Sequence, residues 1–102
     1  MNKFHTGEFC GYAVSAPYRA DFEKIRTELL KDGAYQFETR KEMPLIIDCG
    51  SHVGLSIIYF KSKFPKAKII GFEPDPENLY FLKENLKKNG FEDVTILSLI
   101  HI

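Results

Sequence analysis

The chain has 102 residues, which leaves room for one small domain with a limited core. Hydrophobic residues make up 44% of it and charged residues 27%, as in an ordinary globular chain. Lys and Arg number 14, and so do Asp and Glu, so no net positive field is available to attract nucleic acid or an anionic membrane surface. The composition gives no support to a nucleic-acid-binding role.

The apolar runs at residues 45–47 and 53–60 are shorter than the roughly 20 residues that a membrane helix requires. The first eight residues contain no apolar signal segment, so we expect a cytoplasmic protein without a membrane partner. Cys10 and Cys49 lie far apart and lack metal-ligand spacing. We therefore predict neither a disulfide nor a metal site, and we interpret both cysteines as reduced, inert packing residues, with Cys49 at a buried strand end.

The N-terminal third predicts a strand or hairpin followed by a helix. The first 18 residues mix Gly and Pro with aromatic and β-branched residues, which favours short strands. From about residue 20 to 31 apolar residues recur at helical spacing, and Gly33 provides a stop signal. The apolar positions of this helix are Phe22, Ile25 and Leu29.

The middle of the chain reads as strand, turn, helix and strand. The continuous apolar run 45–47 follows Pro44 and is typical of a parallel strand covered on both faces. A turn at 48–54 leads into an apolar helix from about 53 to 64, which Pro65 ends. The pattern at residues 68–72 predicts a second buried strand. We interpret Lys61, Lys63, Lys66 and Lys68 as a solvated rim.

A third helix and a third strand complete the pattern. Asp75 is a good N-cap, Pro76 suits the first helical position, and Glu77 complements the helix dipole. The helix runs to about residue 89, with Gly90 placed to end it, and a strand follows at 94–97. Its inner face consists of Leu79, Leu82 and Leu86. Helices and strands alternate, which predicts an α/β fold with a parallel sheet in three layers.

The informative segment is 48–54, of sequence DCGSHVG, between a predicted strand and a predicted helix. Ligands of open α/β sheets bind beyond the carboxyl ends of the strands, where this turn lies. Gly50 and Gly54 would let the backbone and a ligand approach closely. We therefore predict a nucleotide site here.

Charge indicates which nucleotide. A dinucleotide fingerprint has the pattern G-x-G-x-x-G, whereas three residues separate the only two glycines of this turn. Asp48 opens the turn and would repel phosphate, while favouring a positively charged ligand such as S-adenosylmethionine, with its sulfonium and ammonium groups. Glu73, at the end of the next strand, is placed to accept hydrogen bonds from both ribose hydroxyls of an adenosine, a contact that NAD also uses.

Two segments together resemble the FkbM-like methyltransferases: DCGSHVGLS at 48–56 and PKAKIIGFEPDPEN at 65–78. The resemblance spans about residues 38–97. It implies a class I methyltransferase fold, a three-layer Rossmann-like parallel sheet of which only the first half is present. It also implies S-adenosylmethionine as cofactor and methyl transfer to a hydroxyl of a sugar, a lipid-linked glycan or a secondary metabolite.

Carried over by position, the resemblance assigns roles to the turn and to the segment after the second strand. Asp48 and Gly50 would face the methionine moiety, and Gly54 would lie where the helix packs. Glu73 would hold the ribose. Pro74 and Asp75 would lie beside the adenine, and the remaining cofactor-binding residues of the turn would be Cys49, Ser51 and His52, where Ser51-His52 replaces the Ala-Asn common among relatives.

Simpler readings of these residues stay open. Asp48 and Glu73 also fit a strand-end acid and a loop acid, and His52 fits a solvated loop residue better than a catalytic base. Tyr35 and Phe37 fit core packing better than a place over the cofactor. The sequence contains no Ser/His/Asp set or paired carboxylates, so we name no catalytic residue.

We therefore divide the chain into an N-terminal strand and helix region at 1–37, the cofactor-binding half of a methyltransferase domain at 38–97, and a truncated or foreign tail at 98–102. We expect it to be the N-terminal part of an O-methyltransferase and inactive alone. The alternatives are an NAD-type nucleotide-binding domain and a non-catalytic remnant. The acceptor and the oligomeric state stay open.

Overall fold

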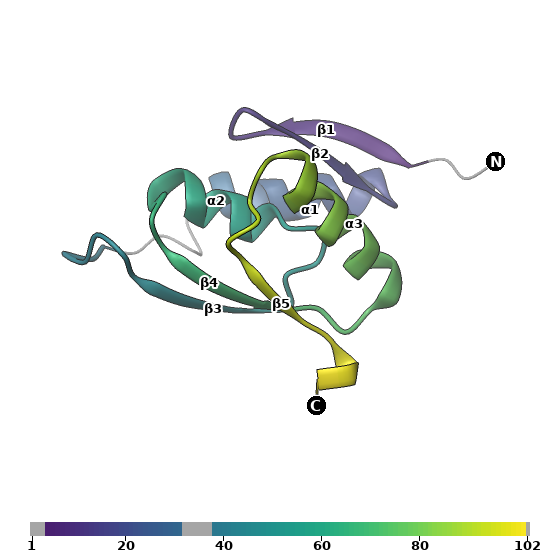
Figure 1. Ribbon diagram of the computed structural model, residues 1–102. Coiled ribbons are helices and arrows are strands. Elements are labelled where there is room, and N and C mark those ends of the chain that lie inside the picture. Colours follow the sequence, from purple (N-terminus) through teal and green to yellow (C-terminus); the bar gives the residue numbers. More distant parts are fainter. Residues whose placement is uncertain (1–3, 32–37, 102) are drawn as a thin grey trace.

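The computed structural model describes residues 4–31 and 38–101 (Figure 1). It contains a hairpin, three helices, a parallel sheet and a final 3-10 turn. In chain order these are β1 (His5–Phe9), β2 (Tyr12–Ala16), α1 (Arg19–Leu30), β3 (Leu45–Cys49), α2 (Leu55–Lys63), β4 (Lys68–Phe72), α3 (Pro76–Lys88), β5 (Thr95–Leu97) and η1 (Leu99–His101). The alternation of helix and strand predicted from the sequence is confirmed. Gly33, Tyr35 and Phe37 lie outside the described residues.

The sheet has the strand order β3-β4-β5, and both pairings are parallel. Leu45 lies opposite Lys68, and Cys49 lies opposite Phe72, which in turn is opposite Leu97. The carboxyl ends of all three strands therefore meet at one edge of the sheet. In an open α/β sheet this is the edge where ligands bind.

The helices lie on one face of the sheet, with the hairpin beyond them (Figure 1). Alternate residues of β3 show the consequence, because Ile46 is buried while Leu45 and Ile47 are 63% and 67% exposed. The expectation that this strand is covered on both faces is therefore wrong, since the described elements cover only one face. Of the three predicted layers, the described residues supply the sheet and one helical layer.

Local signals set the bounds of α2 and α3. Gly54, with φ 105°, is the N-cap of α2, and the helix ends two residues before Pro65. At α3 the Asp75 side chain accepts a hydrogen bond from the Asn78 amide at 3.3 Å, with Pro76 at the first helical position. The predicted cap of α3 is confirmed.

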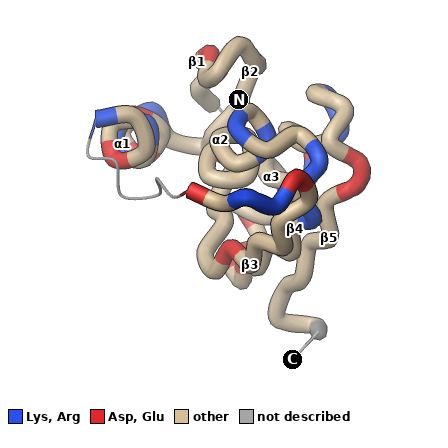
Figure 2. The backbone as a smooth tube through the Cα atoms, turned by 90° about the vertical axis from the view of Figure 1, so that its left-hand side faces the viewer, with Lys and Arg blue, Asp and Glu red and all other residues tan. Residues whose placement is uncertain are grey.

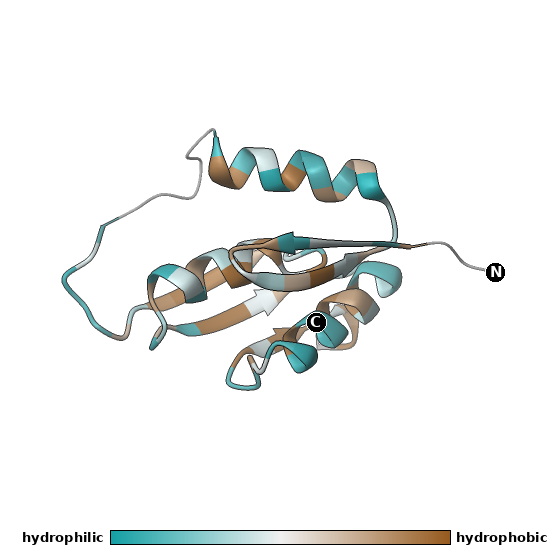
Figure 3. Ribbon diagram, turned by 90° about the horizontal axis from the view of Figure 1, so that it is seen from above, coloured by the Kyte–Doolittle hydropathy of each residue, from teal (hydrophilic) through white to brown (hydrophobic). Residues whose placement is uncertain are grey.

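The N-terminal hairpin pairs antiparallel, with Cys10 and Gly11 in its turn at φ 51° and 85°. Seen from above, it lies between α1 and α3 and contacts both (Figure 3). The core lies between hairpin, helices and sheet. Its largest fully buried apolar side chains include Phe9, Leu29, Ile57, Ile58, Ile69 and Leu82.

Both cysteines are free, as predicted, but both are exposed. Their interpretation as packing residues is therefore wrong. Cys10 occupies the tip of the hairpin, and Cys49 ends β3, an edge strand of the described sheet.

Leu99 and Ile100, in the tail at 98–102, are 60% and 87% exposed. The assignment of this tail as foreign to the fold stays a prediction.

In the described ranges, no helix combines the length and the apolar character needed to cross a membrane. Acidic and basic positions are mixed along α1 (Figure 2).

Candidate functional site

The turn between β3 and α2 is attached to the end of the neighbouring strand. The amides of Gly50 and Ser51 both donate to the Phe72 carbonyl, at 2.8 and 2.9 Å. Because Phe72 is the last residue of β4, these two bonds hold the turn against the carboxyl edge of the sheet. Sequence reasoning placed the turn at this edge, and the structure agrees.

Three residues of the turn have a left-handed backbone: Gly50 at φ 78°, His52 at φ 51° and Gly54 at φ 105°. A Cβ on Gly50 would meet no atom within 4 Å, so open space lies beside the turn at this point. A Cβ on Gly54 would lie 3.0 Å from Leu82 Cδ1, so Gly54 is where the start of α2 packs on α3. Glycine adopts this conformation without the steric cost that His52 bears.

Two serines hold the buried carboxylate of Asp48, which is 6% exposed. Ser51 Oγ and Ser56 Oγ donate to its Oδ2 at 2.8 and 2.5 Å. Ser51 Oγ also lies 3.1 Å from the Asp48 carbonyl oxygen. Gly71 makes room for this arrangement, because a Cβ there would lie 2.7 Å from Ser51 Oγ. Sequence reasoning assigned no role to Ser56 or Gly71.

Glu73, which directly follows β4, holds the turn by a hydrogen bond to its backbone. It is 3% exposed. Its Oε1 accepts from the His52 amide at 2.7 Å, and its Oε2 accepts from the Asp75 amide at 3.0 Å. The side chain thus joins the glycine turn to the start of α3. An ionised carboxylate has about four acceptor positions, so each oxygen retains capacity for one more donor.

The other predicted site residues lie along the same edge with different exposure. Ser51 is buried, Pro74 is half-buried, and Cys49, His52 and Asp75 are exposed. The structure therefore brings together two buried carboxylates, Asp48 and Glu73, on either side of one turn. The His52 side chain is exposed, unlike these two carboxylates.

Asn85 is a further polar residue of this region that sequence reasoning missed. It lies on the inner face of α3, is 0% exposed, and donates from Nδ2 to the Val53 carbonyl of the turn at 2.7 Å. The sequence offered one signal for it: an asparagine, three residues after Leu82 and next to Leu86, on the apolar face of the predicted helix. Buried amides of this kind nearly always have hydrogen-bond partners.

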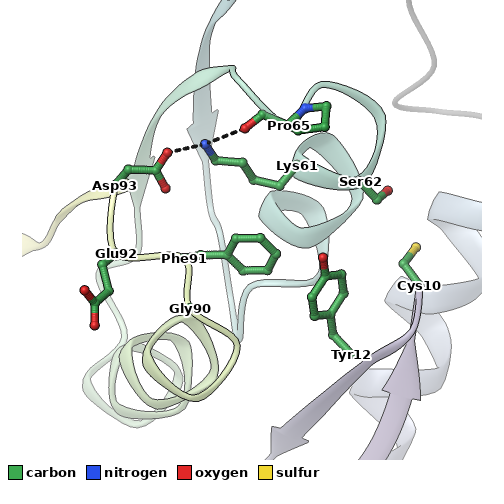
Figure 4. A pocket seen from close by; sticks show the side chains of 9 residues that line it. All are labelled: Cys10, Tyr12, Lys61, Ser62, Pro65, Gly90, Phe91, Glu92 and Asp93. Carbon is green, nitrogen blue, oxygen red and sulfur yellow. Dashed lines mark hydrogen bonds and ion pairs between the residues drawn. The ribbon is translucent and has the colours of Figure 1, made fainter.

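A separate pocket of about 550 Å³ lies near the amino ends of β4 and β5, at the opposite edge of the sheet (Figure 4). Lys61, from the last turn of α2, lines this pocket (Figure 4). Phe91 and Tyr12 also line it, and their ring centroids are 4.9 Å apart. The Lys61 amine donates to the Ala67 carbonyl and to Asp93 Oδ2, both at 2.7 Å.

The interpretation of Lys61 as part of a solvated rim is therefore wrong, because its side chain is only 2% exposed. Lys63, Lys66 and Lys68 are exposed, as expected. The hydrogen bond from Lys61 lowers the pKa of Asp93 below its ordinary value of 3.8, and the Coulombic attraction of the same amine adds to this while burial opposes it. The ion pair joins the end of α2 to the segment before β5.

Among the described residues, no three His, Cys, Asp or Glu side chains gather closely enough to hold a metal ion. The candidate site itself presents the carboxylates of Asp48 and Glu73, the hydroxyls of Ser51 and Ser56, and the backbone of the turn. The donor set suits a cationic ligand with hydroxyl groups better than a phosphate, because two buried carboxylates flank the turn.

Two named proteins are similar to the chain in sequence, and no family model matches it. "Methyltransferase sdnD" of Sordaria araneosa is 36% identical over 78 residues, which are 76% of this chain and 29% of that protein. "Methyltransferase 1" of Beauveria bassiana is 28% identical over 89 residues, 87% of this chain and 35% of that protein. The chain thus spans about a third of the length of these relatives.

A solved structure shows the fold more completely. TYW2 of M. jannaschii, in complex with AdoMet, superposes with a TM-score of 0.67 and 14% identity, over 96% of this chain and 44% of that one. The described elements therefore form part of the Rossmann-like fold found in methyltransferases.

Proposed function

We propose that this chain forms the S-adenosylmethionine-binding part of a methyltransferase. The observation that carries the proposal is the pair of buried carboxylates, Asp48 and Glu73, on either side of a glycine-containing turn at the carboxyl edge of a parallel sheet. The names of both sequence relatives support methyl transfer. The AdoMet complex of TYW2, which shares the fold, supports the cofactor, since AdoMet is S-adenosylmethionine.

Charge favours this cofactor over NAD. A pyrophosphate at the turn would face the Asp48 carboxylate, whereas sulfonium and ammonium groups would be attracted by it, and Glu73 suits the ribose of either cofactor. The open space beside Gly50 leaves room for a ligand to approach the backbone. Asp48 and the turn would hold the methionine end, and the remaining acceptor capacity of Glu73 would hold the ribose hydroxyls. Cys49, Ser51, His52, Pro74 and Asp75 would complete the site, with Gly54 fixing the start of α2.

The cofactor supplies an electrophilic methyl group on sulfur. The residues of this chain orient it, because displacement at a methyl carbon requires the attacking atom and the leaving sulfur to lie in line. The two serines keep Asp48 fixed within the edge of the sheet. Glu73 holds the His52 and Asp75 amides in place. We assign no general base to this chain.

The acceptor is the finer part of the proposal. The resemblance to FkbM-like methyltransferases over residues 38–97 supports O-methylation, at a hydroxyl of a sugar, a glycan or a secondary metabolite. The chain spans about a third of the length of its relatives. In this proposal the acceptor pocket is formed by the part of the longer proteins that the chain does not span.

Calorimetric titration of the 102-residue chain with S-adenosylmethionine, S-adenosylhomocysteine and NAD tests the proposal. We expect the two sulfur ligands to bind more tightly than NAD by at least tenfold, because the Asp48 carboxylate at the turn disfavours the pyrophosphate. Equal or tighter binding of NAD would support a dinucleotide-binding domain instead. Absence of binding by all three ligands would support a non-catalytic remnant.

A further inference from the structure

Asn85 links two parts of the chain that are distant in sequence. It lies in α3, is 0% exposed, and uses both ends of its carboxamide. Its Oδ1 accepts from the Ser15 amide at 2.8 Å, and its Nδ2 donates to the Ser15 carbonyl at 2.8 Å. The side chain thus pairs with β2 as a neighbouring strand would, although it belongs to a helix.

The second hydrogen of Nδ2 goes to the candidate site, where the Val53 carbonyl accepts it at 2.7 Å. This carbonyl and the Gly54 amide belong to the same planar peptide unit. The Gly54 amide in turn donates to the Ser51 carbonyl at 2.9 Å. Both polar groups of the Val53–Gly54 peptide are therefore held, one by Asn85 and the other by the turn itself.

This peptide unit sets the direction in which α2 begins. Gly54 is the N-cap of α2, and its carbonyl accepts the first helical hydrogen bond, from Ile58, at 2.9 Å. Rotation of the preceding peptide would break the bonds that its carbonyl makes to Asn85 and its amide makes to Ser51, and would change the backbone path at the start of α2. With φ at 105°, Gly54 offers little steric resistance to such rotation, so the two hydrogen bonds supply the restraint, and Asn85 provides the one that comes from outside the turn.

We propose that Asn85 is a positioning residue for the cofactor site, and that the N-terminal hairpin supports the glycine turn through it. The inference rests on the proposed function, because the site that it positions is the one assigned above to S-adenosylmethionine. It adds a residue on α3 and a hairpin of residues 5–16 to a site that sequence reasoning confined to residues 48–75.

Asn89, the C-cap residue of α3, provides a control of the same residue type at a half-buried position. Its Nδ2 donates to the Ala13 carbonyl of the hairpin at 2.8 Å and to the Asn85 carbonyl at 2.9 Å. It therefore anchors the hairpin, as Asn85 does, but its hydrogen bonds do not extend to the turn. A residue that only anchored the hairpin would behave like Asn89 in any measurement of the site.

The test compares Asn85→Leu with Asn89→Leu, since leucine has nearly the shape of asparagine without its hydrogen bonds. We expect Asn85→Leu to weaken binding of S-adenosylhomocysteine by at least tenfold in calorimetry, and Asn89→Leu to weaken it less than threefold. We also expect the NMR signal of the Gly54 amide to shift, and its hydrogen exchange to accelerate, in Asn85→Leu alone. Thermal melts by circular dichroism establish that both variants are folded.

If Asn85→Leu fails to fold, Asn85→Ser replaces it. The smaller side chain leaves space for water to bind the backbone groups of Ser15 and Val53 that lose their partner. Equal losses of affinity in the Asn85 and Asn89 variants, with an unchanged Gly54 signal, would refute the positioning role while leaving the proposed function intact. Absence of binding by the unaltered chain would refute the proposed function and, with it, this inference.

Discussion

The carboxylate of Glu73 has a structural role in addition to the proposed role in ligand binding. Its two oxygens hold the amides of His52 and Asp75, so it fixes both the turn and the first residues around α3. A hydrogen bond from a neutral amide to an ionised carboxylate is stronger than one between neutral groups. The ribose assignment therefore adds a second task to a residue that already organises the site.

Glu73→Ala should weaken binding of S-adenosylmethionine by about 1–3 kcal/mol, since it removes an ionised hydrogen-bond acceptor from the ribose hydroxyls and releases the turn. Glu77→Ala, at an exposed position in the first turn of α3, should change affinity much less. Calorimetric titration of both variants measures the difference. If the two substitutions had the same effect, the role of Glu73 in the cofactor site would be wrong.

At the scale of the elements, Lys61 and Asp93 connect α2 to the segment before β5. Asp93 has a lowered pKa in the folded chain, caused mainly by the hydrogen bond from the Lys61 amine. A lowered pKa means that the folded state favours the ionised carboxylate. The pair therefore contributes its full stabilisation above the ordinary pKa of 3.8 and loses it as the pH falls through the lower, folded value.

Asp93→Asn should accordingly make the free energy of unfolding less dependent on pH in the acidic range. We expect the unaltered chain to lose more of its free energy of unfolding than the variant does as the pH falls below about 4. Urea unfolding followed by circular dichroism from pH 6 to pH 2 measures this. Glu92→Gln, at an exposed neighbouring position, controls for the removal of one acidic group. A pH profile for Asp93→Asn that matched the unaltered chain would contradict the coupling.

Elements with strong local signals were predicted closely from the sequence. The strand at 68–72 has the predicted bounds, and Asp75 caps α3 as its position before Pro76 indicated. The errors concern the environment of side chains. Lys61 is buried because carbonyl groups and Asp93, 32 residues away along the chain, happen to surround its amine, and no local pattern encodes this.

The candidate site shows the same division. The turn at 48–54 and Glu73 were found because strand, glycine and acid occur in a recognisable order. Ser56 and Asn85 were missed as site residues, because their parts depend on contacts with Asp48, Ser15 and Val53 that only the folded chain creates. An asparagine on the apolar stripe of α3 was the available signal.

On the scale of the whole molecule, one face of β3 lacks cover in the described structure. Leu45 and Ile47 are 63% and 67% exposed, and β3 is an edge strand of the sheet. Exposed apolar edge strands favour pairing with further strands, including those of other copies. We therefore expect the 102-residue chain to self-associate.

Ile47→Lys should reduce this self-association, because a charged side chain on the open face opposes pairing between edges. Sedimentation velocity of the chain over a range of concentrations measures the effect. Thr95→Lys adds the same charge at an exposed position of β5 without removing apolar surface, and should have a smaller effect. The explanation fails if both variants associate as strongly as the unaltered chain.

The bonds between Asn85 and Ser15 also bear on the order in which the molecule is built. They join residues that are 70 positions apart. The β1–β2 hairpin closes through contacts near in sequence, but its anchor lies on α3. During synthesis the hairpin leaves the ribosome before α3, and its final docking must wait until residue 85 has emerged and α3 has formed. The hairpin is thus made before α3 but docks only after α3 has formed, which makes its docking a late step in the folding of these elements.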